Sequence, residues 1–169
     1  MSAAHPAALD EKALLAHCEV QRTRRSGPGG QHRNKVESAV VLKHAPTGII
    51  AEAAERRSQH ENLRVALRRL RINLAIEHRV DRSDAASPSE LWKSRCRNGR
   101  ISLSERHDDF PTLLAEALDV IDRFGIDLHN AAEFLDCTRT QLVGFLRAEP
   151  RAFAAINRRR VAAGQKRLR

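Results

Sequence analysis

The chain has 169 residues, enough for one domain or two small ones, and its 30 Lys and Arg against 21 Asp and Glu give a formal net charge of +9. This surplus predicts a polyanionic partner, although a basic surface that only aids solubility is the alternative. Aromatic residues make up only 4% of the chain and there is no Tyr, which argues against a sheet that stacks single-stranded bases.

The three cysteines, Cys18, Cys96 and Cys137, lie far apart and include no CxxC pair. This spacing argues against a disulfide framework and a zinc knuckle, so we expect a reducing cytoplasm and no metal or other cofactor. The first twenty residues lack the apolar core of a signal peptide, and no stretch approaches the length of a membrane span.

The first half of the chain predicts a small sheet with one long helix. A short helix is expected over residues 9–17, followed by a first strand in EVQRTRR, residues 19–25. After a glycine-rich stretch, residues 38–44 and 49–55 predict a β-hairpin with Pro and Gly in its turn.

The helix after this hairpin is predicted by its start signal and its periodicity. Ser58 and Glu61 fit a capping box. Apolar residues follow at helical spacing: Leu63, Leu67, Leu70 and Leu74. Four arginines fall outside this stripe, on a face that is either solvated or RNA-binding: Arg64, Arg68, Arg69 and Arg71.

The second half begins with residues 81–106, which are poor in periodicity and read as a basic linker. Its stretch WKSRCRNGR is either a solvated connector or a phosphate contact. An amphipathic helix is then expected from Phe110, with Pro111 in its first turn, to Phe124.

The stretch AAEFLDCTRTQLVGFL predicts a helix, a short turn and a second helix, with Thr138 and Gln141 as a capping box. Asp136 stands where such a turn commonly has Gly. The pattern is that of a helix-turn-helix nucleic-acid module, or of two packed helices without that role. Pro150 opens a last helix before the basic end NRRRVAAGQKRLR.

The stretch GPGGQ, residues 27–31, lacks the GK[ST] ending of a nucleotide P-loop and the spacing of a dinucleotide fold. Its glycines permit backbone conformations closed to other residues. Taken alone, it is most simply a structural turn.

Its surroundings change that interpretation. GPGGQHRNKVESAVVLKHAPTGI, with RRSQHEN before the helix, closely resembles the catalytic domain of class I peptide-chain release factors and their stand-alone ribosome-rescue relatives, over residues 19–74. Gly29, Gly30 and Gln31 match the family's GGQ, whereas Arg33 stands where the family usually has an apolar residue. The other matching residues are Asn34, Lys35, His44, Pro46, Thr47, Gly48, Arg57, Ser58 and Gln59.

The predicted fold is α+β. The resemblance implies a small antiparallel sheet with a packed helix, carrying the GGQ loop, and the periodicity and capping signals from Phe110 onward add an all-helical, helix-turn-helix-like module. The expected division is a catalytic domain over residues 1–80, the linker over 81–106 and the module with a basic tail over 107–169. It also implies codon-independent hydrolysis of the peptidyl-tRNA ester on stalled ribosomes, because fewer than twenty residues precede the first strand and a codon-reading domain is not expected. The main alternative is a non-catalytic RNA- or ribosome-binding regulatory protein on the same scaffold.

The implied catalytic residues are Gly29, Gly30 and Gln31, with the Gln31 N–H stabilising the developing negative charge and its side chain positioning water. The implied partners are large-subunit rRNA and peptidyl-tRNA, with no membrane, for a protein expected to be a cytoplasmic monomer. Residues 107–165 are expected to anchor the protein on RNA, or alternatively on a protein partner. The expected contacts are Arg139, Arg147, Arg151, Arg158, Arg159 and Arg160. The expected nucleic-acid contacts are Arg24, Arg25, His32, Arg33, Asn34, Lys35, Arg57, Gln59, Arg158, Arg159 and Arg160.

Overall fold

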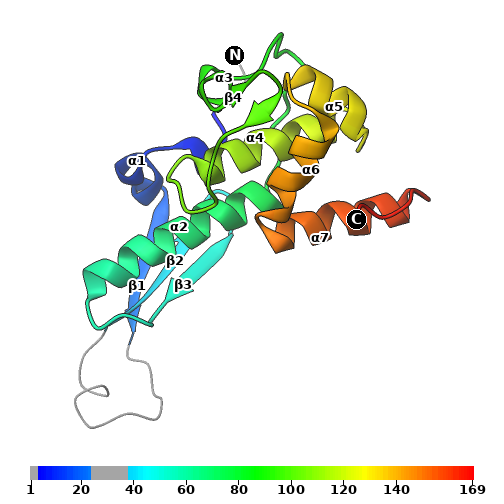
Figure 1. Cartoon of the computed structure of the whole chain (residues 1–169). Coiled ribbons are helices and arrows are strands. Elements are labelled where there is room, and N and C mark those ends of the chain that lie inside the picture. Colours follow the sequence, from blue (N-terminus) through cyan, green and yellow to red (C-terminus); the bar gives the residue numbers. More distant parts are fainter. Residues whose placement is uncertain (1–3, 24–37) are drawn as a thin grey trace. The chain divides into compact units, whose positions relative to one another are not determined.

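The structure is a computed structural model that describes residues 4–23 and 38–169, and these form two compact units (Figure 1). One unit is Pro6–His78, and the other comprises Arg79–Arg169 with the described residues before Pro6. The chain is therefore a mixture of helices and antiparallel sheet, which confirms the predicted α+β class.

The Pro6–His78 unit is built on a three-stranded antiparallel sheet in the order β1-β2-β3. Its elements are η1 (Pro6–Ala8), α1 (Glu11–Ala16), β1 (Cys18–Thr23), β2 (Ala39–His44), β3 (Ile50–Ala53) and α2 (Gln59–Glu77). β1 pairs with β2 along its whole length, from Cys18 opposite His44 to Thr23 opposite Ala39. The predicted first strand and hairpin are both confirmed.

The helix α2 packs on one face of this sheet (Figure 1). Leu67, Leu70 and Leu74 are buried, whereas Leu63 at the start of the stripe is half-buried. The side chain of Ser58 caps the helix by accepting from the Glu61 N–H at 3.4 Å, as its spacing predicts. Local signals therefore identify the start of this helix correctly.

Arg69 and Arg71, two of the arginines outside the leucine stripe, make hydrogen bonds that tie α2 to other parts of the unit. The Arg69 guanidinium donates to both carboxylate oxygens of Glu55 and to the Glu52 carbonyl. The Arg71 Nε donates to the Ala7 carbonyl at 2.9 Å. Tertiary contacts therefore use part of the face for which the sequence left a solvated and an RNA-binding role open.

The second unit is mostly helical and also contains a short hairpin. Its elements are α3 (Glu90–Arg95), β4 (Cys96–Arg97), β5 (Arg100–Ile101), α4 (Phe110–Arg123), α5 (Leu128–Phe134), α6 (Arg139–Arg147) and α7 (Pro150–Ala162). The predicted helices from Phe110 onward are present. The predicted module over residues 107–169 contains α4 to α7, while the antiparallel strands β4 and β5 lie in the segment before it.

Residues 81–106, expected to form a linker, contain α3, β4 and β5 and fall inside this unit. Trp92 is only 1% exposed, its Nε1 donates to the Leu135 carbonyl at 2.7 Å, and its ring meets that of Phe145 edge-on. This burial orders the segment. The sequence lacks a helical period here because α3 is only six residues long.

Two buried carboxylates of helix α4 bind the part of the chain that precedes α3. Glu116 accepts from the Ser89 N–H at 2.7 Å and from its hydroxyl at 2.5 Å. Asp119 accepts from the Val80 N–H at 3.1 Å and from Arg79 at 3.0 Å. Burial raises the pKa of Asp119 to about 6, yet these backbone contacts give both acids a structural role.

Candidate functional site

The residues that the resemblance marks as catalytic, Gly29, Gly30 and Gln31, lie outside the described residues. So do six of the expected RNA contacts: Arg24, Arg25, His32, Arg33, Asn34 and Lys35. The described structure still shows where this segment joins the fold. It connects β1 to β2, whose facing ends are the paired residues Thr23 and Ala39.

A buried asparagine holds the fold together at that point. Asn62, in the first turn of α2, has no exposed surface. Its side-chain amide donates to the Ser38 carbonyl at 2.6 Å and to the Arg56 carbonyl at 2.9 Å, and its oxygen accepts from the Arg56 N–H at 2.9 Å. One side chain therefore ties Ser38, the residue just before β2, to the segment that leads into α2.

Asn62 lies within the RRSQHEN stretch but was not among the predicted site residues. Asparagine has weak helix propensity and competes for backbone hydrogen bonds, so its position near the start of a leucine-rich helix was the available signal.

Three residues that match the family, His44, Thr47 and Gly48, lie at the turn between β2 and β3. His44 is 2% exposed, and its Nδ1 lies 2.8 Å from the Thr47 hydroxyl oxygen. Gly48 has φ of +72°, which the turn requires and which glycine tolerates best. These contacts give His44, Thr47 and Gly48 a structural function in the turn.

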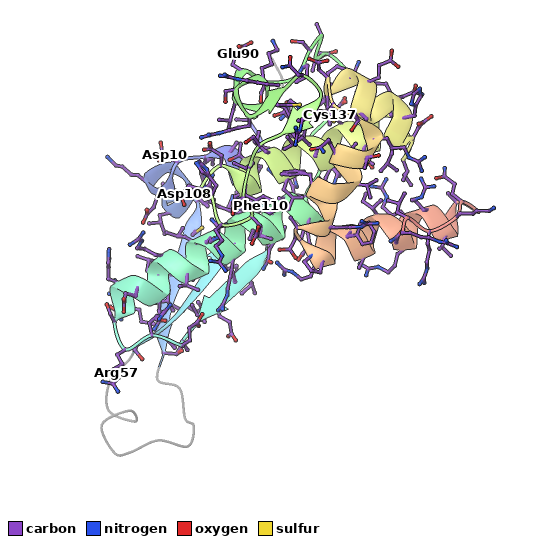
Figure 2. The ribbon with its side chains drawn as sticks, in the orientation of Figure 1. Asp10, Arg57, Glu90, Asp108, Phe110 and Cys137 are labelled. Atoms are coloured by element: carbon purple, nitrogen blue, oxygen red, sulfur yellow. The ribbon has the colours of Figure 1, made fainter. Side chains whose placement is uncertain are left out.

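Two expected RNA contacts lie at the start of α2. Arg57 is exposed just before the helix, and Figure 2 shows its side chain extending from that end of the ribbon. Gln59 is the first residue of α2 and is half-buried. With Arg64 exposed one and a half turns further on, this end of the helix has a basic surface.

The arginines of the C-terminal helix α7 are less available for RNA binding than the sequence predicts. Arg159 forms an ion pair with Asp122, and Arg160 donates to the carbonyls of Lys166 and Ile126. Arg158 is exposed on α7. Of the three arginines expected to contact RNA here, two are therefore engaged within the unit itself.

The cysteines offer little reactivity or metal binding. Burial raises the pKa values of Cys18 and Cys96, and it raises that of Cys137 to about 12, so thiolates are disfavoured. Over residues 4–23 and 38–169, no group of three His, Cys, Asp or Glu side chains is arranged to hold a metal ion. No helix in the same ranges is long and apolar enough to cross a membrane.

Comparison with known proteins supports the family that the sequence motifs indicate. The model of the RF-1 domain family matches residues 12–113, which is more than half of the chain. That match runs through α3 and the β4–β5 hairpin and ends inside α4.

Curated relatives give the same result. Peptide chain release factor 1 of Symbiobacterium thermophilum is 37% identical over 119 residues, which is 70% of this chain and 31% of that protein. Peptide chain release factor 1 of Burkholderia multivorans is 35% identical over 140 residues, which is 82% of this chain and 37% of the relative. The chain thus spans about a third of the length of these relatives.

Proposed function

The chain belongs to the RF-1 domain family, and from that premise we propose that it releases nascent peptides by hydrolysing the ester of peptidyl-tRNA in the ribosome. One observation carries the proposal. The GGQ sequence, Gly29 to Gln31, occupies the connection between β1 and β2, and Asn62 ties the end of that connection to α2.

The chemistry needs little from the protein beyond placement. Water attacks the ester carbonyl carbon, the bond to the ribose oxygen breaks, and a proton passes to that leaving oxygen. The Gln31 N–H donates to the oxygen that becomes negative in the transition state, while the Gln31 side chain positions the water. Gly29 and Gly30 lack a Cβ, so the backbone can approach the tRNA terminus closely.

We propose further that release does not require a stop codon, as the resemblance to rescue factors implies. The proposed partners are large-subunit rRNA and peptidyl-tRNA, for a monomer acting in the cytoplasm. The net charge of +9 and the exposed basic residues at the start of α2, Arg57 and Arg64, support a polyanionic partner.

Single-turnover peptide release tests these proposals. Saturating protein is added to ribosomes that hold labelled peptidyl-tRNA and either a stop codon, a sense codon or an mRNA end in the decoding site. We expect similar rates on the three complexes. Gly30→Ala should slow release by a factor of about a hundred, the scale of one misplaced oxyanion donor, and Gln31→Ala should have a milder effect because it keeps the backbone N–H.

Occupancy of the ribosome is measured separately on the same complexes. Parental release at the stop codon alone would disprove codon independence but keep the release activity. Ribosome binding without release on any complex would replace the enzyme with the non-catalytic regulator. Release by Gly30→Ala at the parental rate would show that the GGQ segment is not the catalytic element.

A further inference from the structure

The stretch WKSRCRNGR, predicted to be either a solvated connector or a phosphate contact, forms the end of α3 and most of the β4–β5 hairpin. The turn consists of Asn98 and Gly99, with φ of +51° and +74°. Two consecutive left-handed residues are what a two-residue type I′ hairpin turn requires, and Asn-Gly is its preferred sequence. The basic residues on either side therefore have defined positions.

The register of this hairpin places two arginines directly opposite each other. Arg97 pairs with Arg100, and Cys96 pairs with Ile101. Neighbouring residues in a strand point to opposite faces. Cys96 is buried and Ile101 half-buried, whereas Arg97 and Arg100 are exposed, so both arginines project from the outer face.

The hairpin is attached to the start of α6. The Thr138 N–H donates to the Gly99 carbonyl at 3.2 Å, and the Ile101 N–H donates to the Gln141 side-chain oxygen at 3.2 Å. The capping-box spacing predicts that Gln141 reaches back to Thr138, but it binds the hairpin instead. Arg139 is the first residue of α6 and so lies close to the turn of the hairpin. Figure 2 labels Cys137, which stands two residues before Arg139 and forms a β-bridge with Gly99 of the turn.

The positions of Arg97, Arg100 and Arg139 are electrostatically unfavourable in the isolated protein. Like charges directly across a strand pair repel each other. A cation in the first turn of a helix opposes the helix dipole. In the part of the chain that the structure describes, Arg97, Arg100 and Arg139 have no ion-pair partner, whereas the nearby Lys93 and Arg95 pair with Glu90 and Asp109. A bound polyanion would relieve both repulsions.

The exposed face of α6 continues this surface with small side chains. Thr140 and Gly144 are exposed one turn apart, and a Cβ added at Gly144 would meet no atom within 4 Å. Asp136 is an exposed acid in the preceding turn, and it offsets part of the positive charge. The result is a basic surface with small side chains on α6, which a nucleic-acid backbone can approach closely.

We propose that this hairpin–helix surface, formed by Arg97, Arg100, Arg139, Thr140 and Gly144, binds the phosphate backbone of double-helical RNA. The choice of RNA rests on the proposed function, since ribosomes present such helices. Among the described residues the large exposed apolar side chains are Val20, Ile50 and Val161, none of them on this surface. Without an exposed ring or apolar anchor there, the surface suits a duplex backbone better than single-stranded bases or a protein partner.

The test measures binding of the full chain to a labelled 20-base-pair RNA duplex by fluorescence anisotropy across a salt series. The triple variant Arg97→Gln, Arg100→Gln, Arg139→Gln should lose about tenfold or more in affinity near physiological salt. Its slope of log K against log salt should become shallower by roughly 2 to 3, because each lost phosphate contact removes about 0.9. Thermal stability should stay equal or rise, because the repulsion is removed.

The matched control neutralises three exposed basic residues elsewhere: Lys12→Gln, Lys166→Gln and Arg167→Gln. We expect less than a threefold loss for this variant. An equal loss in both variants would mean that only net charge matters and would overturn the proposal. Tighter binding of the parent to a DNA duplex of the same sequence, or no binding to the RNA duplex, would overturn it as well.

Peptide release is measured in parallel, so the two proposals fail separately. If the parent releases no peptide but the triple variant still loses RNA affinity, the proposed function falls and this surface stands. If release persists while RNA affinity is unchanged in the triple variant, the surface falls and the proposed function stands.

Discussion

Replacing Asn62 by Ala should destabilise the Pro6–His78 unit more than any other polar substitution on α2. The change removes three hydrogen bonds, to the Ser38 carbonyl and to both backbone groups of Arg56. At about 1 kcal/mol net for each bond, the loss is about 3 kcal/mol. The better helix propensity of Ala returns about 0.5 kcal/mol, which leaves an expected decrease of 2–3 kcal/mol, approximately, in the free energy of unfolding.

The matched control is Asn73→Ala on the same helix. It gains the same helix propensity and removes the bond from the Asn73 side chain to the Ile50 carbonyl, 2.8 Å long, so its cost should be about 1 kcal/mol or less. The difference between the two variants then isolates the buried network.

Amide hydrogen exchange in β2 and α2 is the appropriate assay, because it reports on this unit alone. Fluorescence of the single tryptophan would not serve, since Trp92 belongs to the other unit. Equal protection in Asn62→Ala and Asn73→Ala would refute the reasoning.

Asn62→Asp provides a second check on the same network. A carboxylate would face the carbonyls of Ser38 and Arg56 with an acceptor instead of a donor, so this variant should be at least as unstable as Asn62→Ala at neutral pH. Protonation restores one donor, so its protection should recover as the pH falls. A deficit that does not change with pH would contradict the donor assignment.

Two further predictions concern the buried rings. Burial, followed by the charges of His17 and His78, lowers the pKa of His44 below its ordinary value of 6.5. Below pH 6.5 the unfolded chain therefore binds more protons than the native unit. Exchange protection in β2 should be highest above pH 6.5 and should fall on acidification, by at most about 1.4 kcal/mol per pH unit. The variant His44→Gln should flatten this pH dependence. Trp92→Ala should destabilise the second unit by about 4 kcal/mol, because the ring is buried and bonded to Leu135. Thermal unfolding followed by circular dichroism measures this loss, and a change below 1 kcal/mol would show that residues 90–95 are not held by the ring.

Several elements followed from the sequence because their causes are local. Ser58 and Thr138 cap the helices that their spacing marks, and the leucines after Ser58 form the buried stripe of α2. Asp136 takes a φ of +51° where glycine is common, so the turn before α6 forms despite the substitution. The family resemblance rested on GGQ together with the hairpin and helix-start residues around it, and of these the described structure includes only the hairpin and helix-start residues.

Other features depended on partners distant in the chain. The Asn98-Gly99 turn had a recognisable signal, but its two-residue strands have no period of their own, and the density of arginines favoured a connector. Trp92 orders that segment through Leu135, 43 positions away.

The roles of Asn62 and Gln141 were likewise decided by tertiary structure. Capping rules predict that Gln141 bonds within its own helix, and only the docked hairpin offers it the Ile101 N–H. Asn62 is an unremarkable polar residue until the sheet brings Ser38 within 2.6 Å of its amide. Periodicity, caps and motifs are properties of neighbouring residues, so sequence alone determined the longer elements and the family. The pairing of buried polar groups depends on which distant backbone atoms the fold brings together, so only the tertiary structure decided it.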